Sequence, residues 1–196
     1  MSKVLILTGS PRKGGNTDRL VAAFVEGARK NNEIKVISIA DVMVSPCIGC
    51  NACFVREGNS CVQRDDMELI YDRLKEADTL IIASPVYFYG VSAQLKAVID
   101  RLHTPMRSCF GIKRLGLILV GAADLPELFD SILTQYRLVL NFFKLKDIGT
   151  VLVRGAREKG SVRESSLKEA YELGRSIGND MMNSAMTASS KPLRNS

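Results

Sequence analysis

The chain has 196 residues, of which 46 % are hydrophobic and 24 % charged, the profile of a soluble globular protein rather than a collagenous, low-complexity or disordered one. A chain of this length can bury about 70 % of its unfolded surface in one core. The net charge is +6, but the basic residues are scattered and tryptophan is absent. A nucleic-acid binder would concentrate Lys and Arg on one face, so we expect no nucleic-acid partner.

Five short β-rich apolar runs alternate with five segments whose apolar residues recur at helical spacing. In chain order, the predicted elements are strand Lys3–Thr8, helix Thr17–Lys30, strand Ile34–Ile39, helix Asp66–Glu76, strand Thr79–Ser84, helix Ser92–His103, strand Arg114–Val120, helix Leu125–Phe143, strand Ile148–Val153 and helix Lys168–Met182. Asn16 or Thr17 is expected to cap the first helix, and Ser92 the third. This alternation predicts an α/β fold with a parallel sheet covered on both faces. We expect one domain over residues 1–182 and a loosely ordered tail over 183–196.

The longest apolar run, Leu115–Ala123, is too short to span a bilayer, and the first residues lack the pattern of a signal peptide. We therefore predict a cytoplasmic protein with no membrane partner. In a reducing compartment, the five cysteines are expected to be metal ligands, redox groups or free thiols rather than disulfides.

A glycine-rich turn separates the first strand from the first helix, with the sequence Gly9-Ser10-Pro11-Arg12-Lys13-Gly14-Gly15-Asn16-Thr17. Unpaired N–H groups and the helix dipole make such a turn an anion site. A triphosphate loop would need a lysine where Gly15 stands, and the spacing of Gly9 and Gly14 does not fit a dinucleotide fingerprint. A tight turn that merely needs glycine is the alternative. The many donor and basic residues favour a loop for a single terminal phosphate.

The third strand ends in Ser84-Pro85-Val86-Tyr87-Phe88-Tyr89-Gly90-Val91-Ser92. Three consecutive aromatic residues there would suit the edge of a flat conjugated ring, or would pack under a loop or in a dimer interface. In a doubly wound sheet, ligands bind beyond the carboxyl ends of the strands. The loops after strands 1, 3 and 4, the last being Gly121-Ala122-Ala123-Asp124, would converge there. A phosphate socket beside an aromatic wall predicts a site for flavin mononucleotide (FMN).

These segments, together with Val91-Ser92-Ala93-Gln94-Leu95-Lys96-Ala97-Val98-Ile99-Asp100-Arg101, resemble the NADPH-dependent FMN reductase family. The resemblance is good over roughly Met1–Arg101. It implies a flavodoxin-like, three-layer, doubly wound, five-stranded parallel sheet of order 2-1-3-4-5, in a homodimer or homotetramer. By matching position it implies that four residues hold the phosphate and four lie against the isoalloxazine. With Gly14 and Gly121, the predicted cofactor-binding residues are Ser10, Arg12, Asn16 and Thr17 (phosphate) and Pro85, Val86, Tyr87 and Phe88 (ring).

Four cysteines, Cys47, Cys50, Cys53 and Cys61, have the spacing C-x2-C-x2-C-x7-C. The first intervals are those of bacterial ferredoxins. With Asp65-Asp66-Met67 behind them, they are similar to the iron–sulfur flavoproteins, a branch of the same family, and that resemblance implies a [4Fe–4S] cluster on these four residues. Free thiols and a zinc site are the alternatives.

No other segment resembles a catalytic constellation, and we predict no catalytic residue. The basic residues after the fifth strand, Arg154, Arg157, Lys159 and Arg163, are expected to form a solvated loop, with the 2′-phosphate of NADPH as an alternative ligand. The sequence predicts an oxidoreductase that passes electrons from NAD(P)H through bound FMN to a small-molecule acceptor such as flavin or quinone. The alternatives are an iron–sulfur electron-transfer protein, with a protein partner as acceptor, and a non-catalytic flavin-binding module.

Overall fold

The computed structural model describes residues 1–188, and the side-chain surroundings of residues 1–177. Its five strands are β1 (Ser2–Thr8), β2 (Asn32–Ser38), β3 (Thr79–Pro85), β4 (Arg114–Val120) and β5 (Lys146–Val153). The α-helices are α1 (Asn16–Ala28), α2 (Met67–Glu76), α3 (Ala93–Arg101), α4 (Asp130–Phe143) and α5 (Glu164–Ala188). All strand pairs are parallel and the order is β2-β1-β3-β4-β5. The predicted doubly wound, flavodoxin-like fold is confirmed.

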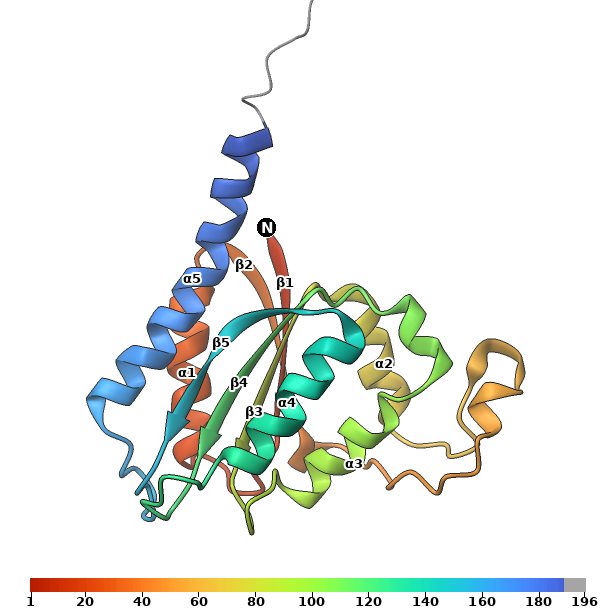
Figure 1. The fold of residues 1–196 in the computed structure, drawn as a ribbon, viewed down its shortest axis with the longest axis horizontal. Helices are drawn as coiled ribbons and strands as arrows, with labels where there is room; N and C mark the ends of the chain where they lie inside the picture. Colours follow the sequence, from red (N-terminus) through yellow and green to blue (C-terminus); the bar gives the residue numbers. More distant parts are fainter. Residues whose placement is uncertain (189–196) are drawn as a thin grey trace, which may run out of the picture.

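Two apolar clusters lie on opposite faces of the sheet, because successive side chains of a strand point in opposite directions. In β1, Val4 and Ile6 join the cluster beneath α1 and α5, whereas Leu5 and Leu7 join the cluster beneath α2, α3 and α4. Figure 1 shows these two helical layers, with the strands between them. Strands buried on both faces explain the nearly continuous apolar runs of the sequence.

Helices α1 and α5 pack unusually closely through two glycines. A Cβ atom at Gly27 would lie 2.0 Å from the carbonyl oxygen of Tyr171, and one at Gly174 would lie 2.1 Å from that of Phe24. No side chain fits at either position, so the backbones of the two helices are in contact here.

The ends of three helices test the predicted caps and bounds. Ser92 caps α3, its Oγ accepting from the Leu95 N–H at 3.4 Å, as predicted. The predicted cap of α1 is wrong, because the helix already begins at Asn16 and Gly15 precedes it. Helix α4 begins at Asp130 rather than at the predicted Leu125.

The late start of α4 has a local cause. The guanidinium of Arg154 donates to the carbonyl oxygens of Leu125 (2.8 Å) and Pro126 (2.7 Å). The Leu125 oxygen also accepts from the Leu128 N–H at 3.2 Å, three residues on, which is the contact of a turn rather than of an α-helix. A proline also lacks the N–H that a helix interior needs.

Within residues 1–188, the structure contains no helix that is long and apolar enough to cross a bilayer. The predicted tail, 183–196, begins inside α5, and its residues 189–196 lie outside the described part of the chain. The division into a domain and a tail therefore stays a prediction.

Candidate functional site

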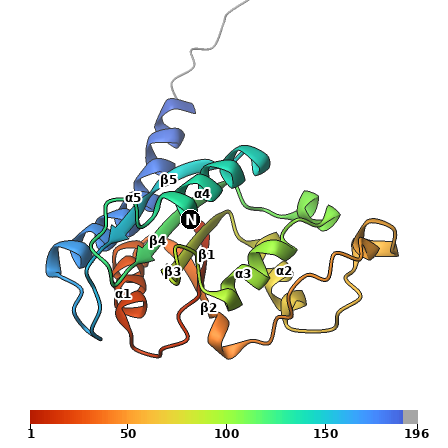
Figure 2. The same cartoon turned by 60° about the horizontal axis from the view of Figure 1, so that its bottom comes forward.

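A cavity of about 190 Å³ opens at the carboxyl ends of the strands, the edge that Figure 2 turns toward the viewer. Its walls come from the turns that follow β1, β3, β4 and β5. Seven of the ten predicted cofactor-binding residues line it, namely Ser10, Arg12, Asn16, Thr17, Pro85, Val86 and Tyr87. Gly14, Phe88 and Gly121 lie outside the lining. Sequence reasoning missed Gly15, Val120, Ala122, Ala156, Arg157 and Lys159 as lining residues.

The turn after β1 is shaped by its own side chains. The buried Ser10 Oγ donates to the Arg12 carbonyl oxygen (3.0 Å) and accepts from the Arg12 N–H (3.2 Å), which closes a tight turn. Gly15 has no side chain to cap α1, so the first N–H groups of the helix stay available to a ligand in the cavity. These open donors, together with the helix dipole, give the turn its affinity for anions.

The side-chain amide of Asn16 forms hydrogen bonds with other parts of the protein. Its Nδ2 donates to the carbonyl oxygens of Ala156 (3.0 Å) and Glu158 (2.8 Å), and its Oδ1 accepts from the Gly160 N–H (2.8 Å). The side chain therefore fastens the turn after β1 to residues 156–161, although it also lines the cavity.

Three cationic side chains line the cavity, those of Arg12, Arg157 and Lys159, and no carboxylate does. Lys13, in contrast, forms an exposed ion pair with Asp41 at 2.8 Å. The hydrogen bond and the charge of Asp41 raise the pKa of Lys13. The lining is thus electropositive without Lys13, as a phosphate site requires.

The turn after β3 is strained. Tyr87 and Gly90 exchange two backbone hydrogen bonds of 2.9 and 3.0 Å, and the two residues between them, Phe88 and Tyr89, have φ angles of 47° and 63°. Such a turn normally takes Asn or Gly at these positions, and other residues there cost about 1–3 kcal/mol each. The Ser131 hydroxyl on α4 donates to the Tyr89 carbonyl oxygen and holds the turn.

Two aromatic side chains of this turn, Tyr87 and Phe88, differ in whether they line the cavity. Tyr87 lines the cavity, whereas Phe88 is 99 % exposed and does not belong to the lining. The turn after β4 lies close by, and Gly121 is needed there because a Cβ atom would lie 2.3 Å from Leu128 Cδ2. Together, Pro85, Val86 and Tyr87 form an apolar and aromatic wall beside the cationic turn.

The four clustered cysteines lie in a loop that projects away from the sheet, drawn in orange in Figure 1. Cys47 and Cys50 are exposed, Cys53 and Cys61 are half-buried, and all four are free thiols. Among the side chains that the structure describes, those of residues 1–177, no three of His, Cys, Asp or Glu come together as a metal-binding group. The structure does not bring the predicted cluster ligands into one site.

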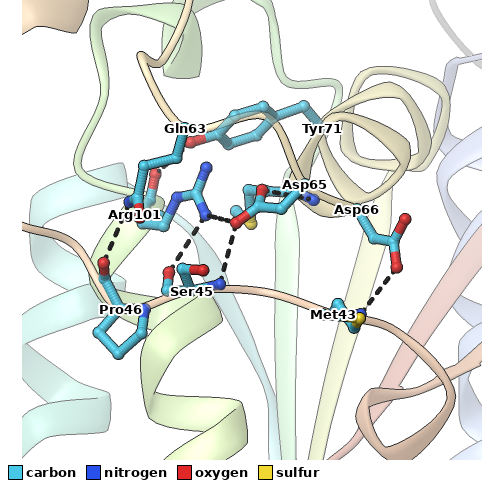
Figure 3. A network of polar contacts seen from close by, with 9 residues as sticks. Met43, Ser45, Pro46, Gln63, Asp65, Asp66, Tyr71 and Arg101 are labelled. Atoms are coloured by element: carbon cyan, nitrogen blue, oxygen red, sulfur yellow. Dashed lines mark hydrogen bonds and ion pairs between the residues drawn. The ribbon is translucent and has the colours of Figure 1, made fainter.

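The base of this loop is fixed by a buried ion pair (Figure 3). Asp65 Oδ2 accepts from Arg101 Nη1 at 2.5 Å and from the Ser45 N–H at 2.9 Å. The two side chains are 10 % and 3 % exposed. Burial has the largest single effect on the pKa of Asp65 and raises it. The hydrogen bonds from Arg101 and from the Ser45 and Met67 N–H groups have the opposite effect, and together they lower the pKa below its ordinary value.

Two further contacts join the ends of the loop. The Met43 N–H donates to Asp66 Oδ2 at 2.7 Å, and Gln63 Nε2 donates to the Pro46 carbonyl oxygen at 3.0 Å. Tyr71, whose hydroxyl donates to the Arg101 carbonyl oxygen at 2.8 Å, lies beneath the loop. Burial raises the pKa of Tyr71 to about 12. The sequence analysis singled out Asp65-Asp66-Met67, but it did not indicate that these residues bind Arg101 and residues 43–46, because the network joins three separate segments.

Comparison with known proteins gives the family. A model described as NADPH-dependent FMN reductase matches residues 2–157. An iron-sulfur flavoprotein of Methanocaldococcus jannaschii is 44 % identical over 124 residues, 62 % of this chain and only 63 % of that protein. An iron-sulfur flavoprotein of Archaeoglobus fulgidus is 33 % identical over 182 residues, 89 % of this chain and 78 % of that protein.

Among solved structures, an NAD(P)H:quinone oxidoreductase from Methanothermobacter marburgensis superposes with a TM-score of 0.72. It is 19 % identical, and the match covers 90 % of this chain and 98 % of that one, which supports the fold. Because the family match spans most of the sequence, this chain belongs to the NADPH-dependent FMN reductase family.

Proposed function

We propose that this protein is an FMN-dependent oxidoreductase that takes electrons from NAD(P)H and delivers them to a small-molecule acceptor such as a flavin or a quinone. One observation carries the proposal: a single cavity joins an electropositive turn at a helix N-terminus to an apolar and aromatic wall. A phosphate monoester attached to a flat ring system has these two parts. The family match supports the same cofactor.

The residues of the cavity fit FMN in their chemistry. The open N–H groups of α1 and the guanidinium of Arg12 would hold the phosphate, since both offer donors to an anion. Thr17 is 2 % exposed and lies at the same end of the cavity. Pro85, Val86 and Tyr87 would lie against the ring and exclude water from one of its sides.

Bound FMN would supply the redox chemistry, accepting a hydride from the nicotinamide and releasing electrons to the acceptor. The task of the chain is to orient the reactants and to set the local field. No carboxylate, histidine or cysteine is found in the cavity lining. The proposed reaction needs none of them, because the flavin carries the hydride chemistry and the protein contributes position and electrostatics.

We also propose a cytoplasmic location and a homodimer or homotetramer. Five cysteines, all of them free, support a reducing compartment. Leu138 and Phe142 on α4 are 64 % and 52 % exposed, which supports a contact between subunits on that face. Size-exclusion chromatography with light scattering measures the subunit number, and a monomer at micromolar concentration would refute the oligomer.

The function is tested by adding FMN to protein freed of flavin and following the quenching of its fluorescence, then by measuring NADH and NADPH oxidation with a quinone. We expect stoichiometric binding and a rate that requires both FMN and protein. Binding without turnover would favour a flavin-binding module. The absence of binding would refute the proposal.

A second candidate is an electron-transfer protein with a [4Fe–4S] cluster on Cys47, Cys50, Cys53 and Cys61. The cysteine spacing and the names of the two relatives favour it. The four thiols suit a cluster chemically, but they do not converge in the described structure, so we derive no step through it. Anaerobic purification tests it: broad absorbance near about 400 nm with four irons per chain would support the cluster, whereas iron-free protein would refute it.

A further inference from the structure

The outer wall of the cavity consists of residues 156–161, the loop between β5 and α5. Ala156, Arg157 and Lys159 belong to the lining. The sequence interpretation treated the basic residues of this region as a solvated loop, because nothing in their spacing marks a binding motif. The structure instead brings two of them to the turn that follows β1, about 140 residues earlier in the chain.

Several hydrogen bonds hold the loop against that turn. Asn16 alone accounts for four of them, with Ala156, Glu158, Gly160 and Ser161. Arg19 Nη1 donates to the Gly160 carbonyl oxygen at 2.5 Å. Lys159 Nζ donates to the Lys13 carbonyl oxygen at 3.3 Å, which places its ammonium directly over the turn. The loop is therefore a fixed wall rather than a free segment.

The charges of this wall are not neutralised inside the protein. Within the described part of the chain, the Arg157 side chain takes part in no hydrogen bond or ion pair, and Lys159 meets only a neutral carbonyl oxygen. Arg154, three residues before Arg157, shows the contrast, because its guanidinium is occupied by two carbonyl oxygens and the Phe129 ring. Two cations without an anionic partner, beside a cavity whose lining lacks carboxylates, attract an anion into it.

We propose that Arg157 and Lys159 are phosphate ligands of this site, and that Asn16 is a positioning residue that holds them there instead of a ligand itself. The inference rests on the proposed FMN site and adds a second wall to it. A phosphate monoester carries a charge of about −1.5 to −2 at pH 7. Arg12 and the N-terminus of α1 offset part of that charge, and Arg157 and Lys159 offset the rest. The phosphate would lie between two loops from opposite ends of the chain.

Comparing FMN with riboflavin isolates the phosphate contribution, because the two ligands share the ring and differ only in the phosphate. We would measure both dissociation constants for wild type, Arg157→Gln, Lys159→Gln and the control Arg163→Gln. The control removes the same charge from a residue outside the lining. We expect the first two variants to weaken FMN binding about tenfold each, the usual effect of losing a hydrogen bond to a charged group, with riboflavin binding changed less than about twofold. Arg163→Gln should change neither constant by more than about twofold.

Asn16→Ala tests the positioning role. Releasing the loop should weaken FMN binding about as much as Arg157→Gln and Lys159→Gln combined, and it should add little in a protein that already carries both substitutions. A direct phosphate ligand would give a further loss in that background and would overturn the assignment of Asn16. Urea unfolding of each variant confirms that the protein compared is folded.

The outcomes separate this inference from the proposed function. In one outcome, wild type binds FMN and quenches its fluorescence, and Arg157→Gln and Lys159→Gln bind FMN as tightly as wild type does. Arg157 and Lys159 are then not phosphate ligands and the inference fails, while the proposed function stands. Equal losses for FMN and riboflavin would also overturn it, because they would indicate a structural effect. If wild type binds neither flavin, the proposed function fails first.

Discussion

Removing one partner of the buried ion pair between Asp65 and Arg101 should destabilise the protein more than removing one partner of an exposed ion pair, and Asp65→Asn tests this. The substitution keeps the shape and an acceptor oxygen but removes the charge opposite a guanidinium that is 3 % exposed. Removing one partner of a buried pair leaves the other charge uncompensated and costs about 3–5 kcal/mol. Since the amide still accepts hydrogen bonds, we expect the lower end, about 3 kcal/mol.

Urea unfolding at pH 7 measures the effect. With a slope of about 2 kcal/mol per molar urea, the midpoint should fall by about 1.5 M. The matched control is Asp72→Asn on α2, the helix that begins two residues after Asp65. Asp72 pairs with Lys75 at 2.9 Å, but the two side chains are 65 % and 41 % exposed. An exposed pair contributes about 0–1 kcal/mol. Equal losses in Asp65→Asn and Asp72→Asn would refute the reasoning.

The pH dependence gives the same test a second readout. The pKa of Asp65 in the folded protein lies below its ordinary value of 3.8. The ionised pair therefore stabilises the folded state fully above that value, and the stabilisation is lost as the pH falls through the lowered pKa. The difference between wild type and Asp65→Asn should be constant from pH 7 to about pH 5 and should shrink in more acidic solution. A difference that grows on acidification would contradict the assigned pair.

Two more substitutions test the helix contacts. Gly27→Ala should destabilise the protein by about 2 kcal/mol or more, because the new Cβ atom would lie 2.0 Å from the Tyr171 carbonyl oxygen. This loss is expected even though alanine favours a helix over glycine by about 1 kcal/mol. An unchanged or higher melting temperature would show that α1 and α5 do not pack this closely. Ser92→Ala should lower the free energy of unfolding in urea by about 1 kcal/mol, because α3 loses its cap. The control Ser108→Ala, at an exposed position, should leave the free energy of unfolding unchanged. Equal effects of the two substitutions would show that loss of the cap is not the cause.

The sheet could be predicted because its signals are local. Strand β4 has the predicted bounds, Arg114–Val120, since a strand buried on both faces is a continuous apolar run. Strand β5 begins two residues earlier than predicted, at Lys146. Its first residues are polar and the pairing with β4 is irregular near Leu115. A polar start at the edge of a sheet has no apolar pattern from which it could be recognised.

The features that the sequence did not show depend on contacts between distant segments. The predicted start of α4 was wrong because residues 125–128 form a turn, whose Leu125 and Pro126 carbonyl oxygens accept from Arg154, a residue that follows β5. The cysteine spacing likewise describes distances along the chain and not in space. Whether four thiols converge depends on how the loop folds on its base, and Asp65 and Arg101, which fix that base, lie 36 residues apart.

Asn16 shows how a residue can line the expected cavity while its side chain forms hydrogen bonds within the protein. Resemblance placed it among the phosphate ligands, and it does line the cavity, yet its amide is occupied by residues 156–161. The family match ends at residue 157, within that loop, so the partner of Asn16 lies at the border of the region that a family motif describes. A motif near one end of a chain indicates where an anion binds. The further phosphate ligands that we propose, Arg157 and Lys159, could not be recognised from that motif, because only the fold brings the loop before α5 back to the turn after β1.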